Sequence, residues 1–235
     1  MRFYCESIDT ESFLDPVESS HLCRVLRAKK GTTLELFDGQ GTLAEGTVER
    51  VDKKHTSVRV QKIERTSLLK TGRIILAVSF AKGQRFDWLV EKCTELGVDH
   101  VAAVQFERTV KLGKNTALER YRKISIAAAK QSKSLFLPEI SGPEKFSATL
   151  DSLIGQYPQS VLFYGDPEGT ALSDLSAVKE GQDCIIVIGP EGGLCESELA
   201  LLASKNSSGV MINRNILRIE TAAVAFCAMV AVTRL

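Results

Sequence analysis

The residues that point most directly to chemistry form a glycine-rich turn. Gly189-Pro190-Glu191-Gly192-Gly193-Leu194, which we call the collar, directly follows the apolar run Cys184–Ile188. Glycine loses more backbone entropy on folding than other residues, so a cluster of glycines indicates a need for positive φ or for close approach to the main chain. The collar therefore predicts accessible backbone N–H and C=O groups that can bind a flat polar ligand.

A second polar segment, residues 212–222, follows the next apolar run, and we call it the elbow. Its sequence, Ile212-Asn213-Arg214-Asn215-Ile216-Leu217-Arg218-Ile219-Glu220-Thr221-Ala222, predicts a strand end, a polar turn and a helix that starts near Glu220 or Thr221. An arginine beside a ligand-binding turn is suited to binding an anion or stabilising developing negative charge. The alternative is that Arg218 and Glu220 form a surface ion pair.

Several common catalytic and binding motifs are absent from the sequence. It contains no G-x-G-x-x-G fingerprint, P-loop, H-E-x-x-H or G-x-S-x-G motif. This disfavours dinucleotide and nucleoside triphosphate chemistry, and no metal site is expected. The histidines are scattered and are interpreted as surface or packing residues: His21, His55 and His100. No two of the six cysteines have the C-x-x-C spacing, which favours reduced thiols in a cytoplasmic protein.

The charge distribution indicates a local rather than a global cationic surface. The 235-residue chain has 44% apolar residues and a formal net charge of +1, which argues against a globally cationic nucleic-acid binder. Between Glu107 and Lys145, however, nine basic residues accompany four acidic ones. This excess predicts either an RNA-binding platform or a solvated helix face. No apolar run reaches the roughly 20 residues of a membrane-spanning helix, so no membrane partner is expected.

Short strand-like segments dominate the chain up to about residue 70. They predict a small antiparallel sheet or barrel with strands at 32–37, 42–51 and 56–63. Residues 21–27 predict a short helix with Leu22, Val25 and Leu26 facing inward. Residues 68–72 are interpreted as a linker, so that one domain covers residues 1–70 and a second covers residues 71–235.

In the second domain, strands alternate with helices. Strands are predicted at 74–79, 101–105, 161–164, 184–188 and 210–212, and helices at 86–96, 117–132, 196–204 and from 220 onward. This alternation predicts an α/β fold with a mostly parallel sheet covered on both faces. Ligands of such sheets bind beyond the carboxyl ends of the strands. Three turns are expected to lie there: residues 165–169, the collar and residues 213–215.

The closing helix is apolar on every side over residues 222–232, so it is expected to be buried on every side. A terminal helix rarely achieves this against its own domain alone. The pattern therefore predicts a homodimer, and the alternative is a central helix enclosed within the monomer.

The collar and the elbow together resemble the RsmE family of ribosomal RNA uridine N3-methyltransferases, within the SPOUT superfamily. The resemblance runs nearly the full length of the chain. Further similar segments are residues 21–27, Lys82-Gly83 before Asp87-Trp88, residues 91–98, residues 107–109, and Gln131-Ser132 ahead of Pro138.

The resemblance implies a small PUA-like RNA-binding β-barrel domain and a C-terminal SPOUT α/β domain with a trefoil knot. Periodicity alone predicts an unknotted sheet, because knots are rare. The resemblance also implies a cytoplasmic homodimer that uses S-adenosylmethionine to methylate N3 of a uridine in 16S ribosomal RNA, either naked or within the small subunit. The implied cofactor-binding residues are Ile188, Gly189, Glu191, Gly192, Gly193, Ile212, Leu217, Arg218, Ile219 and Ala222.

Methyl transfer to uridine N3 requires the nitrogen to lose its proton, because its lone pair is otherwise not available. Arg218 is the residue expected to stabilise the negative charge that spreads onto the neighbouring carbonyl oxygens. The base is expected to be Glu220 or Glu191, or the proton passes to solvent. RNA phosphates are expected to contact a set of basic residues: Arg24, Arg27, Lys29, Lys30, Arg108 and Lys133.

Three positions depart from the family pattern. Asn213 stands where glycine is usual, and Asn215 and Ser134 stand where arginine is common. Asparagine tolerates positive φ, so the turn at residue 213 can be kept, whereas the two lost cations point to weaker phosphate contacts or another target. Two alternative functions remain: a SPOUT methyltransferase acting on another base or on a ribose 2′-hydroxyl, and a non-catalytic RNA-binding assembly protein.

Overall fold

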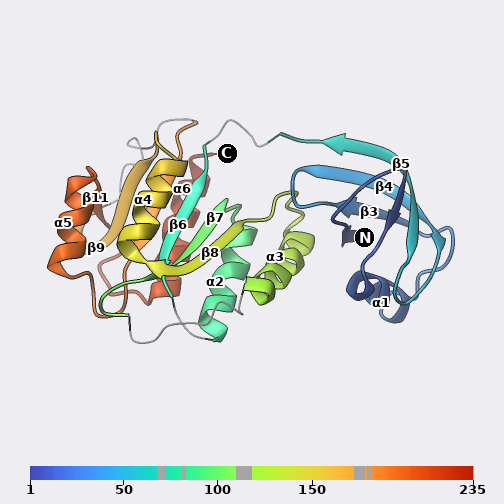
Figure 1. The fold of residues 1–235 in the computed structure, drawn as a ribbon, viewed down its shortest axis with the longest axis horizontal. Helices are drawn as coiled ribbons and strands as arrows, with labels where there is room; N and C mark the ends of the chain where they lie inside the picture. Colours follow the sequence, from blue (N-terminus) through green and yellow to red (C-terminus); the bar gives the residue numbers. More distant parts are fainter. Residues whose placement is uncertain (68–71, 81–82, 110–117, 172–177, 179–180, 235) are drawn as a thin grey trace. The chain divides into compact units, whose positions relative to one another are not determined.

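The computed structural model describes residues 1–67, 72–80, 83–109, 118–171, 178 and 181–234. The chain divides into two compact units (Figure 1). The N-terminal unit contains Met1–Leu69 and Ile126–Leu137, and the C-terminal unit contains Lys70–Ser125 and Pro138–Leu235. The linker expected at 68–72 lies outside the described residues except for Gly72, and Lys82 lies outside them too.

The N-terminal unit is built on a five-stranded sheet with the order β1-β3-β4-β5-β2. Its members are β1 (Arg2–Tyr4), β2 (Glu11–Phe13), β3 (Thr33–Phe37), β4 (Thr42–Arg50) and β5 (Ser57–Arg65). The last three form an antiparallel meander at the predicted positions, and β1 pairs with β3 in parallel. Apolar side chains from alternate strand positions, together with Leu14 and Leu22, form one buried core.

The first helix begins earlier than predicted. Helix α1 spans Pro16–Arg24, because the Asp15 carboxylate accepts a hydrogen bond from the Glu18 amide at 2.7 Å and proline occupies the first turn. Leu22 is buried as expected, whereas Val25 lies beyond the helix and is 66% exposed. The prediction that Val25 and Leu26 face inward is therefore wrong.

Part of helix α3 (Leu118–Ser132) belongs to the N-terminal unit. Ala129 packs against Tyr4 and Phe37 in a small buried cluster. Lys130 forms an ion pair with Glu18 at 2.7 Å, and both side chains are largely buried. These contacts explain why residues 126–137 group with the sheet at the start of the chain.

The C-terminal unit contains a six-stranded sheet in which every pairing is parallel. The strand order is β11-β9-β10-β6-β7-β8. The strands are β6 (Ile74–Ser79), β7 (His100–Gln105), β8 (Glu139–Lys145), β9 (Val161–Ala171), β10 (Cys184–Ile188) and β11 (Ser208–Met211). Because β6 and β10 are buried at every residue, they read in the sequence as continuous apolar runs.

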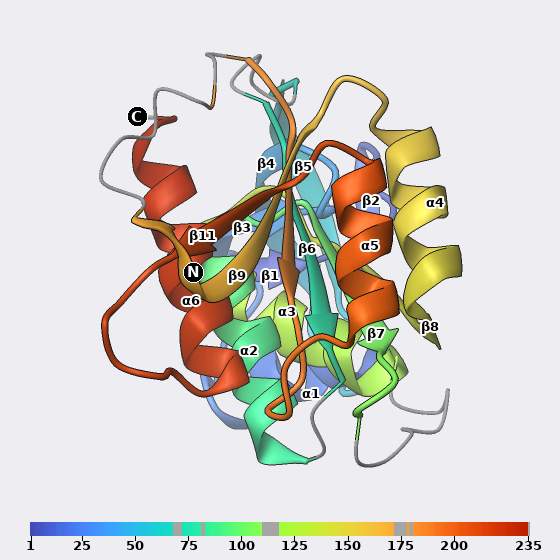
Figure 2. The same cartoon turned by 90° about the vertical axis from the view of Figure 1, so that its left-hand side faces the viewer.

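Helices cover both faces of this sheet, as predicted (Figure 2). Helices α2 (Gln84–Glu95) and α6 (Ile219–Val232) pack on one face. Helices α4 (Phe146–Gln156) and α5 (Glu196–Ser204) pack on the other. The sequence pattern predicted neither β8 nor α4. Strand β8 lacks a regular apolar pattern because it is a partly exposed edge strand interrupted by Gly142-Pro143.

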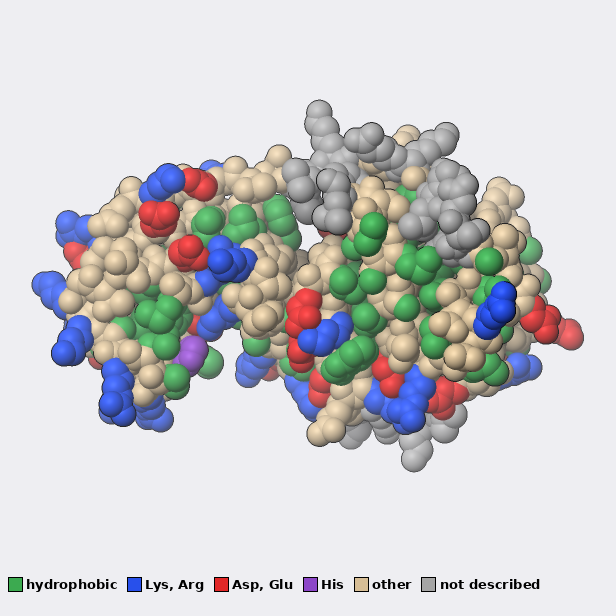
Figure 3. Space-filling model, turned by 180° about the vertical axis from the view of Figure 1, so that it is seen from behind, with side chains coloured by type: hydrophobic (Ala, Val, Ile, Leu, Met, Phe, Trp, Pro, Cys, Tyr) green, Lys and Arg blue, Asp and Glu red, His purple; other side chains and the backbone are tan. Residues whose placement is uncertain are grey.

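Helix α6 is buried on one side and partly exposed on the other. Phe226, Cys227 and Val230 are buried, but Val232 is 65% exposed and Ala225 and Ala228 are partly exposed. Seen from behind, where α6 is nearest the viewer, hydrophobic side chains gather on the surface of this unit (Figure 3). The alternative of a central helix enclosed within the monomer is therefore wrong, whereas burial on every side by a second subunit stays a prediction.

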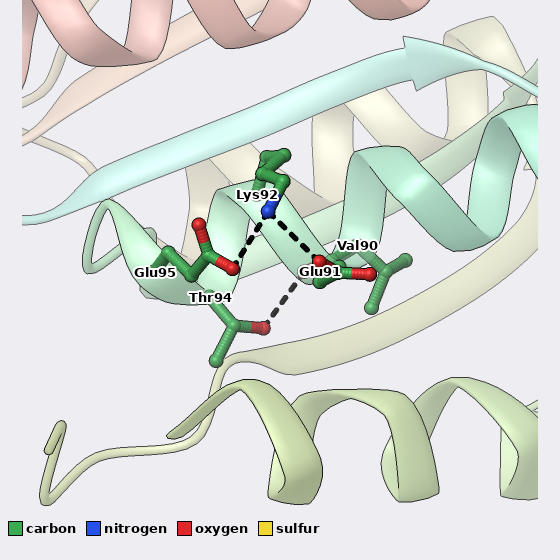
Figure 4. A network of polar contacts seen from close by, with 5 residues as sticks. All are labelled: Val90, Glu91, Lys92, Thr94 and Glu95. Atoms are coloured by element: carbon green, nitrogen blue, oxygen red, sulfur yellow. Dashed lines mark hydrogen bonds and ion pairs between the residues drawn. The ribbon is translucent and has the colours of Figure 1, made fainter. Parts of the chain in front are cut away.

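Helix α2 carries ion pairs on its outer side. Lys92 contacts Glu91 and Glu95 at 2.8 Å, and the Thr94 hydroxyl donates to the Val90 carbonyl at 2.8 Å (Figure 4). Both carboxylates raise the pKa of Lys92 by accepting hydrogen bonds from its ammonium group. These contacts all join residues of the same helix.

Candidate active site

A cavity of about 410 Å³ opens at the carboxyl ends of β9, β10 and β11. Ligands of parallel sheets commonly bind at this edge. Its described lining comes from residues 164–168, from the end of β10 with the collar, from Leu199 of α5, and from residues 210–222 at intervals. The structure thus brings the collar and the elbow to one cavity.

Residues 165–169 were expected to form a turn after a short strand, but they are a bulge inside a longer one. Tyr164 pairs with Gly209 and Thr170 pairs with Val210, so five residues of β9 are looped out between consecutive residues of β11. The bulge directs Tyr164, Asp166 and Glu168 to the cavity. We did not assign these side chains to the site, although a pair of carboxylates directly after an apolar run was a usable signal.

The conformation of the collar explains why two of its positions are occupied by glycine. Gly193 has a φ of 73°, and its amide donates to the Pro190 carbonyl at 2.9 Å, which closes the turn. A Cβ atom at position 189 would lie 2.9 Å from a methyl carbon of Leu194, so the chain passes close to that side chain. The turn is therefore compact and leaves little room for larger residues.

The loop after β7 holds the collar and the start of α5. The Arg108 guanidinium donates to the Gly192 carbonyl at 2.8 Å. The buried carboxylate of Glu198 accepts from the amide of Glu107 at 2.8 Å and from the amide of Cys195 at 2.9 Å. Glu198 thus completes a capping box at the first turn of α5 and also ties that turn to a neighbouring loop.

The polar turn of the elbow is closed by a side chain of its own. The side-chain Oδ1 atom of Asn213 accepts from the Asn215 amide at 2.8 Å, which forms an Asx-turn. Asn213 is not among the described non-glycine residues with positive φ, so the turn does not use the left-handed conformation that asparagine could adopt. Residues 213–216 are exposed, and Ile216 is 89% exposed.

Most of the residues expected to bind cofactor line the cavity. These are Ile188, Gly189, Glu191, Gly193, Ile212, Leu217, Ile219 and Ala222. Gly192 and Arg218 do not line it; Arg218 is the exposed N-cap residue of α6, and its carbonyl accepts from the Ala222 amide at 2.8 Å. Glu220 is only 9% exposed and lies in the first turn of α6 beside the lining residues.

The residues expected to bind RNA fall into both units. Arg24, Arg27, Lys29 and Lys30 are exposed at and after the end of α1 in the N-terminal unit. Lys133 is exposed in the same unit and has a φ of 63°. Its backbone carbonyl accepts a hydrogen bond from the Arg2 guanidinium at 2.6 Å. Arg108 is exposed in the C-terminal unit, where it contacts the collar.

The cavity combines apolar walls with negative charge. The charged side chains among its described lining residues are Asp166, Glu168 and Glu191, and that part of the lining contains neither lysine nor arginine. Apolar side chains such as Ile188, Leu199 and Val210 provide the remaining wall. Such a surface suits a ligand with a flat apolar part and a positive charge. Among the described residues, no group of three His, Cys, Asp or Glu side chains is placed to hold a metal ion.

Comparison with known proteins identifies the family. Residues 68–231 match the RNA methyltransferase domain family, and residues 14–61 match the RNA methyltransferase PUA domain. The ribosomal RNA small subunit methyltransferase E of Rickettsia conorii is 30% identical over 88% of this chain and 83% of its own length. The chain belongs to the ribosomal RNA small subunit methyltransferase E family. This confirms the resemblance inferred from the collar and the elbow, and it confirms that the chain is an RNA methyltransferase.

Solved structures show the same fold in this methyltransferase family. A putative methyltransferase from Legionella pneumophila, in complex with bound SAM, is 25% identical and has a TM-score of 0.86 over 98% of this chain and 96% of its own. A ribosomal RNA small subunit methyltransferase E from Neisseria gonorrhoeae, bound to S-adenosyl methionine, is 25% identical with a TM-score of 0.84 over 97% of this chain and 95% of its own. The predicted α/β domain with a small PUA-like β domain is confirmed, and the trefoil knot stays a prediction.

Proposed function

We propose that this chain transfers the methyl group of S-adenosylmethionine to N3 of a uridine in small-subunit ribosomal RNA. The observation that carries the proposal is the single cavity formed by the collar, the elbow and the bulge of β9. Its walls match the parts of S-adenosylmethionine: apolar side chains for the adenine, and carboxylates for a ligand with a sulfonium and an ammonium group. The two solved relatives that hold this cofactor support the assignment.

The residues of the chain have distinct tasks in this reaction. S-adenosylmethionine supplies an activated methyl group with a good leaving group, so the protein has to position the acceptor and help it lose a proton. The collar, whose Gly192 carbonyl accepts from Arg108, provides a rigid surface for the cofactor, and Glu198 ties the following turn of α5 to the same loop. Arg218 is the exposed N-cap residue of α6, and we assign it the task of donating to the uridine carbonyl oxygens as they gain negative charge.

The candidate acceptors of the N3 proton are Glu191, Glu220 and solvent. Glu191 lines the cavity, whereas Glu220 is buried next to it. The position of Glu191 makes it the more direct acceptor, because a base has to come within hydrogen-bond reach of the proton that it removes.

We propose that residues 1–70 form the RNA-binding domain and residues 71–235 the methyltransferase domain. Arg24, Arg27, Lys29 and Lys30 are exposed in the first of these and can contact RNA phosphates. Such contacts release counterions, so RNA affinity is expected to fall as salt rises. An RNA affinity that does not change between low and high salt would contradict this part of the proposal. A ribosomal RNA substrate also implies a cytoplasmic location; none of the described helices is long and apolar enough to cross a membrane.

We also propose that the chain acts as a homodimer through the open side of α6. Ala225, Ala228 and Val232 lie on one face of this helix, and Trp88 of the neighbouring α2 is 42% exposed. Placing an aspartate at Ala228 is expected to shift the protein to monomers in sedimentation analysis. The matched control is Ala148→Asp on the exposed side of α4, which is expected to leave the oligomeric state unchanged.

The decisive experiment is methyl transfer from labelled S-adenosylmethionine to small-subunit ribosomal RNA and to assembled subunits, with the product nucleoside identified by mass spectrometry. The expected product is N3-methyluridine. Another methylated base or a 2′-O-methylated nucleoside would assign a different acceptor, and absence of S-adenosylmethionine binding in calorimetry would assign a non-catalytic role.

A further inference from the structure

Arg85 is a cation that joins the two halves of the site from outside the cavity. It lies in the first turn of α2. The N-cap residue of this helix is Gly83, which has a φ of 72°. Its Nη1 atom is 3.0 Å from Glu191 Oε1, and its Nε atom is 3.9 Å from Glu220 Oε1. Arg85 is not among the cavity-lining residues. The family resemblance drew attention to Lys82-Gly83 and Asp87-Trp88 on either side of it but assigned Arg85 no role.

The two partners of Arg85 belong to different parts of the site. Glu191 is the side chain of the collar, and it lines the cavity. Glu220 belongs to the last part of the elbow and lies between Ile219 and Ala222, which both line the cavity. Among the described residues, no other lysine or arginine forms an ion pair with either carboxylate. Arg85 therefore links the collar to the end of the elbow.

These contacts contribute little to overall stability but much to local geometry. The side chains of Arg85 and Glu191 are 49% and 61% exposed, and pairs this exposed typically contribute little to stability. Glu220 differs, because its side chain is 11% exposed and its Oε2 atom is buried with no partner among the described residues. A buried carboxylate depends on nearby positive charge, and Arg85 and the start of α6 supply it.

We propose that Arg85 is a positioning residue that sets the distance between the collar and the elbow through Glu191 and Glu220, and thereby couples cofactor binding to methyl transfer. This inference rests on the proposed function of the same site. A guanidinium has donors in a fixed planar fork, so it can hold two carboxylates at a defined separation, whereas the lysine ammonium is a point charge on a flexible stem. Lysine at this position should therefore restore the charge but only part of the geometry.

The test uses the full-length chain and compares Arg85→Ala and Arg85→Lys with Lys92→Ala. Lys92→Ala removes one cation from the same helix, and its partners lie on α2 itself (Figure 4). Arg85→Ala is expected to weaken S-adenosylmethionine binding in calorimetry and to lower kcat, each by about tenfold. Arg85→Lys should recover part of both losses. The thermal unfolding midpoint should change by no more than in Lys92→Ala, whose binding and turnover should match the wild type.

A double-mutant cycle tests whether Arg85 acts through Glu191. If it does, Arg85→Ala in a Glu191→Gln background should weaken S-adenosylmethionine binding by clearly less than tenfold, because the contact has already been lost. Additive effects in the cycle, wild-type binding by Arg85→Ala, or a change in RNA affinity alone would overturn the inference.

The experiment also separates this inference from the proposed function. Wild-type protein that does not bind S-adenosylmethionine would overturn both. Wild-type protein that binds the cofactor but forms no N3-methyluridine would overturn the proposed acceptor, while the calorimetric comparison would still decide the role of Arg85.

Discussion

The collar and the elbow line the same cavity but are held in different ways. The collar follows a strand buried at every residue, and the loop after β7 holds it through the Arg108 guanidinium. The polar turn of the elbow follows the short, partly exposed β11 at the edge of the sheet, and a hydrogen bond from the Asn215 amide to the Asn213 side chain closes it. The collar is thus held by a distant part of the chain, whereas the polar turn of the elbow is held by a local contact.

This difference assigns different tasks to the two segments. A segment with many outside contacts is preorganised, so it can bind a ligand at low entropic cost. An exposed segment with few contacts belongs to the less stable part of a protein and can adjust when a partner binds. We therefore expect changes in the collar to affect cofactor affinity and changes in the elbow to affect turnover. The following variants test this division, from the largest expected effect to the smallest.

Replacing Arg218 in the elbow should have the largest effect. Arg218→Ala is expected to lower kcat about 100-fold, because a donor to the developing negative charge is lost. In calorimetry, the affinity of this variant for S-adenosylmethionine should stay within about twofold of the wild-type value. The control is Arg214→Ala, which removes an exposed cation from the same turn. Unchanged turnover in Arg218→Ala would remove this residue from the mechanism.

Replacing Glu198 should affect the collar instead. Glu198→Ala leaves the amides of Glu107 and Cys195 without their acceptor, which should reduce the free energy of unfolding by about 1–3 kcal/mol. S-adenosylmethionine binding should weaken by about tenfold because the collar is less well ordered. The exposed Glu196 provides the matched control, since Glu196→Ala removes a carboxylate from the same turn of α5. Wild-type affinity in Glu198→Ala would mean that the collar does not depend on this contact.

Replacing Asn213 should have a smaller and local effect. Asn213→Ala removes the acceptor of the Asx-turn, whose hydrogen bond contributes about 0.5–1.5 kcal/mol. Hydrogen exchange of the Asn215 amide should become faster, while the amides of the collar should keep their protection. Asn213→Asp retains an acceptor oxygen and should exchange like the wild type. Faster exchange throughout the collar would show that this Asx-turn also orders the collar.

The amino end of β7 offers a reference away from both segments. His100 is 3% exposed; its Nε2 atom is 2.7 Å from the Ser141 hydroxyl and its Nδ1 atom 3.3 Å from the Tyr157 hydroxyl. Burial lowers its pKa, although Glu139 at 3.9 Å opposes this effect. The unfolded chain then binds a proton more readily, so stability should fall as the pH drops below about 6.5.

The measurement for His100 is urea unfolding at several pH values. The loss of stability on acidification should be smaller in His100→Gln, whereas S-adenosylmethionine affinity at neutral pH should be unchanged. An equal pH dependence in the variant would assign the acid sensitivity to other groups.

Much of the site was predictable because its signals are local. A run of buried β-branched residues followed by clustered glycines marks a strand and a ligand turn within a dozen positions. The same holds for the alternation of strands and helices after residue 70. Elements without such periodicity were missed: β8 combines Gly142-Pro143 with partial exposure, and the bulge at 165–169 appears only when β11 pairs on both sides of it.

The amino-acid sequence by itself determined the family, the α/β alternation, and the position of the collar and the elbow, because each depends on residues that are neighbours along the chain. Only the tertiary structure decided which distant groups meet. Arg85 reaches Glu191 across 106 positions, Glu107 reaches Glu198 across 91, and one face of α6 is partly exposed. These contacts form when the parallel sheet packs with its helices and loops. They cannot be predicted from local periodicity, because the residues are far apart in the sequence.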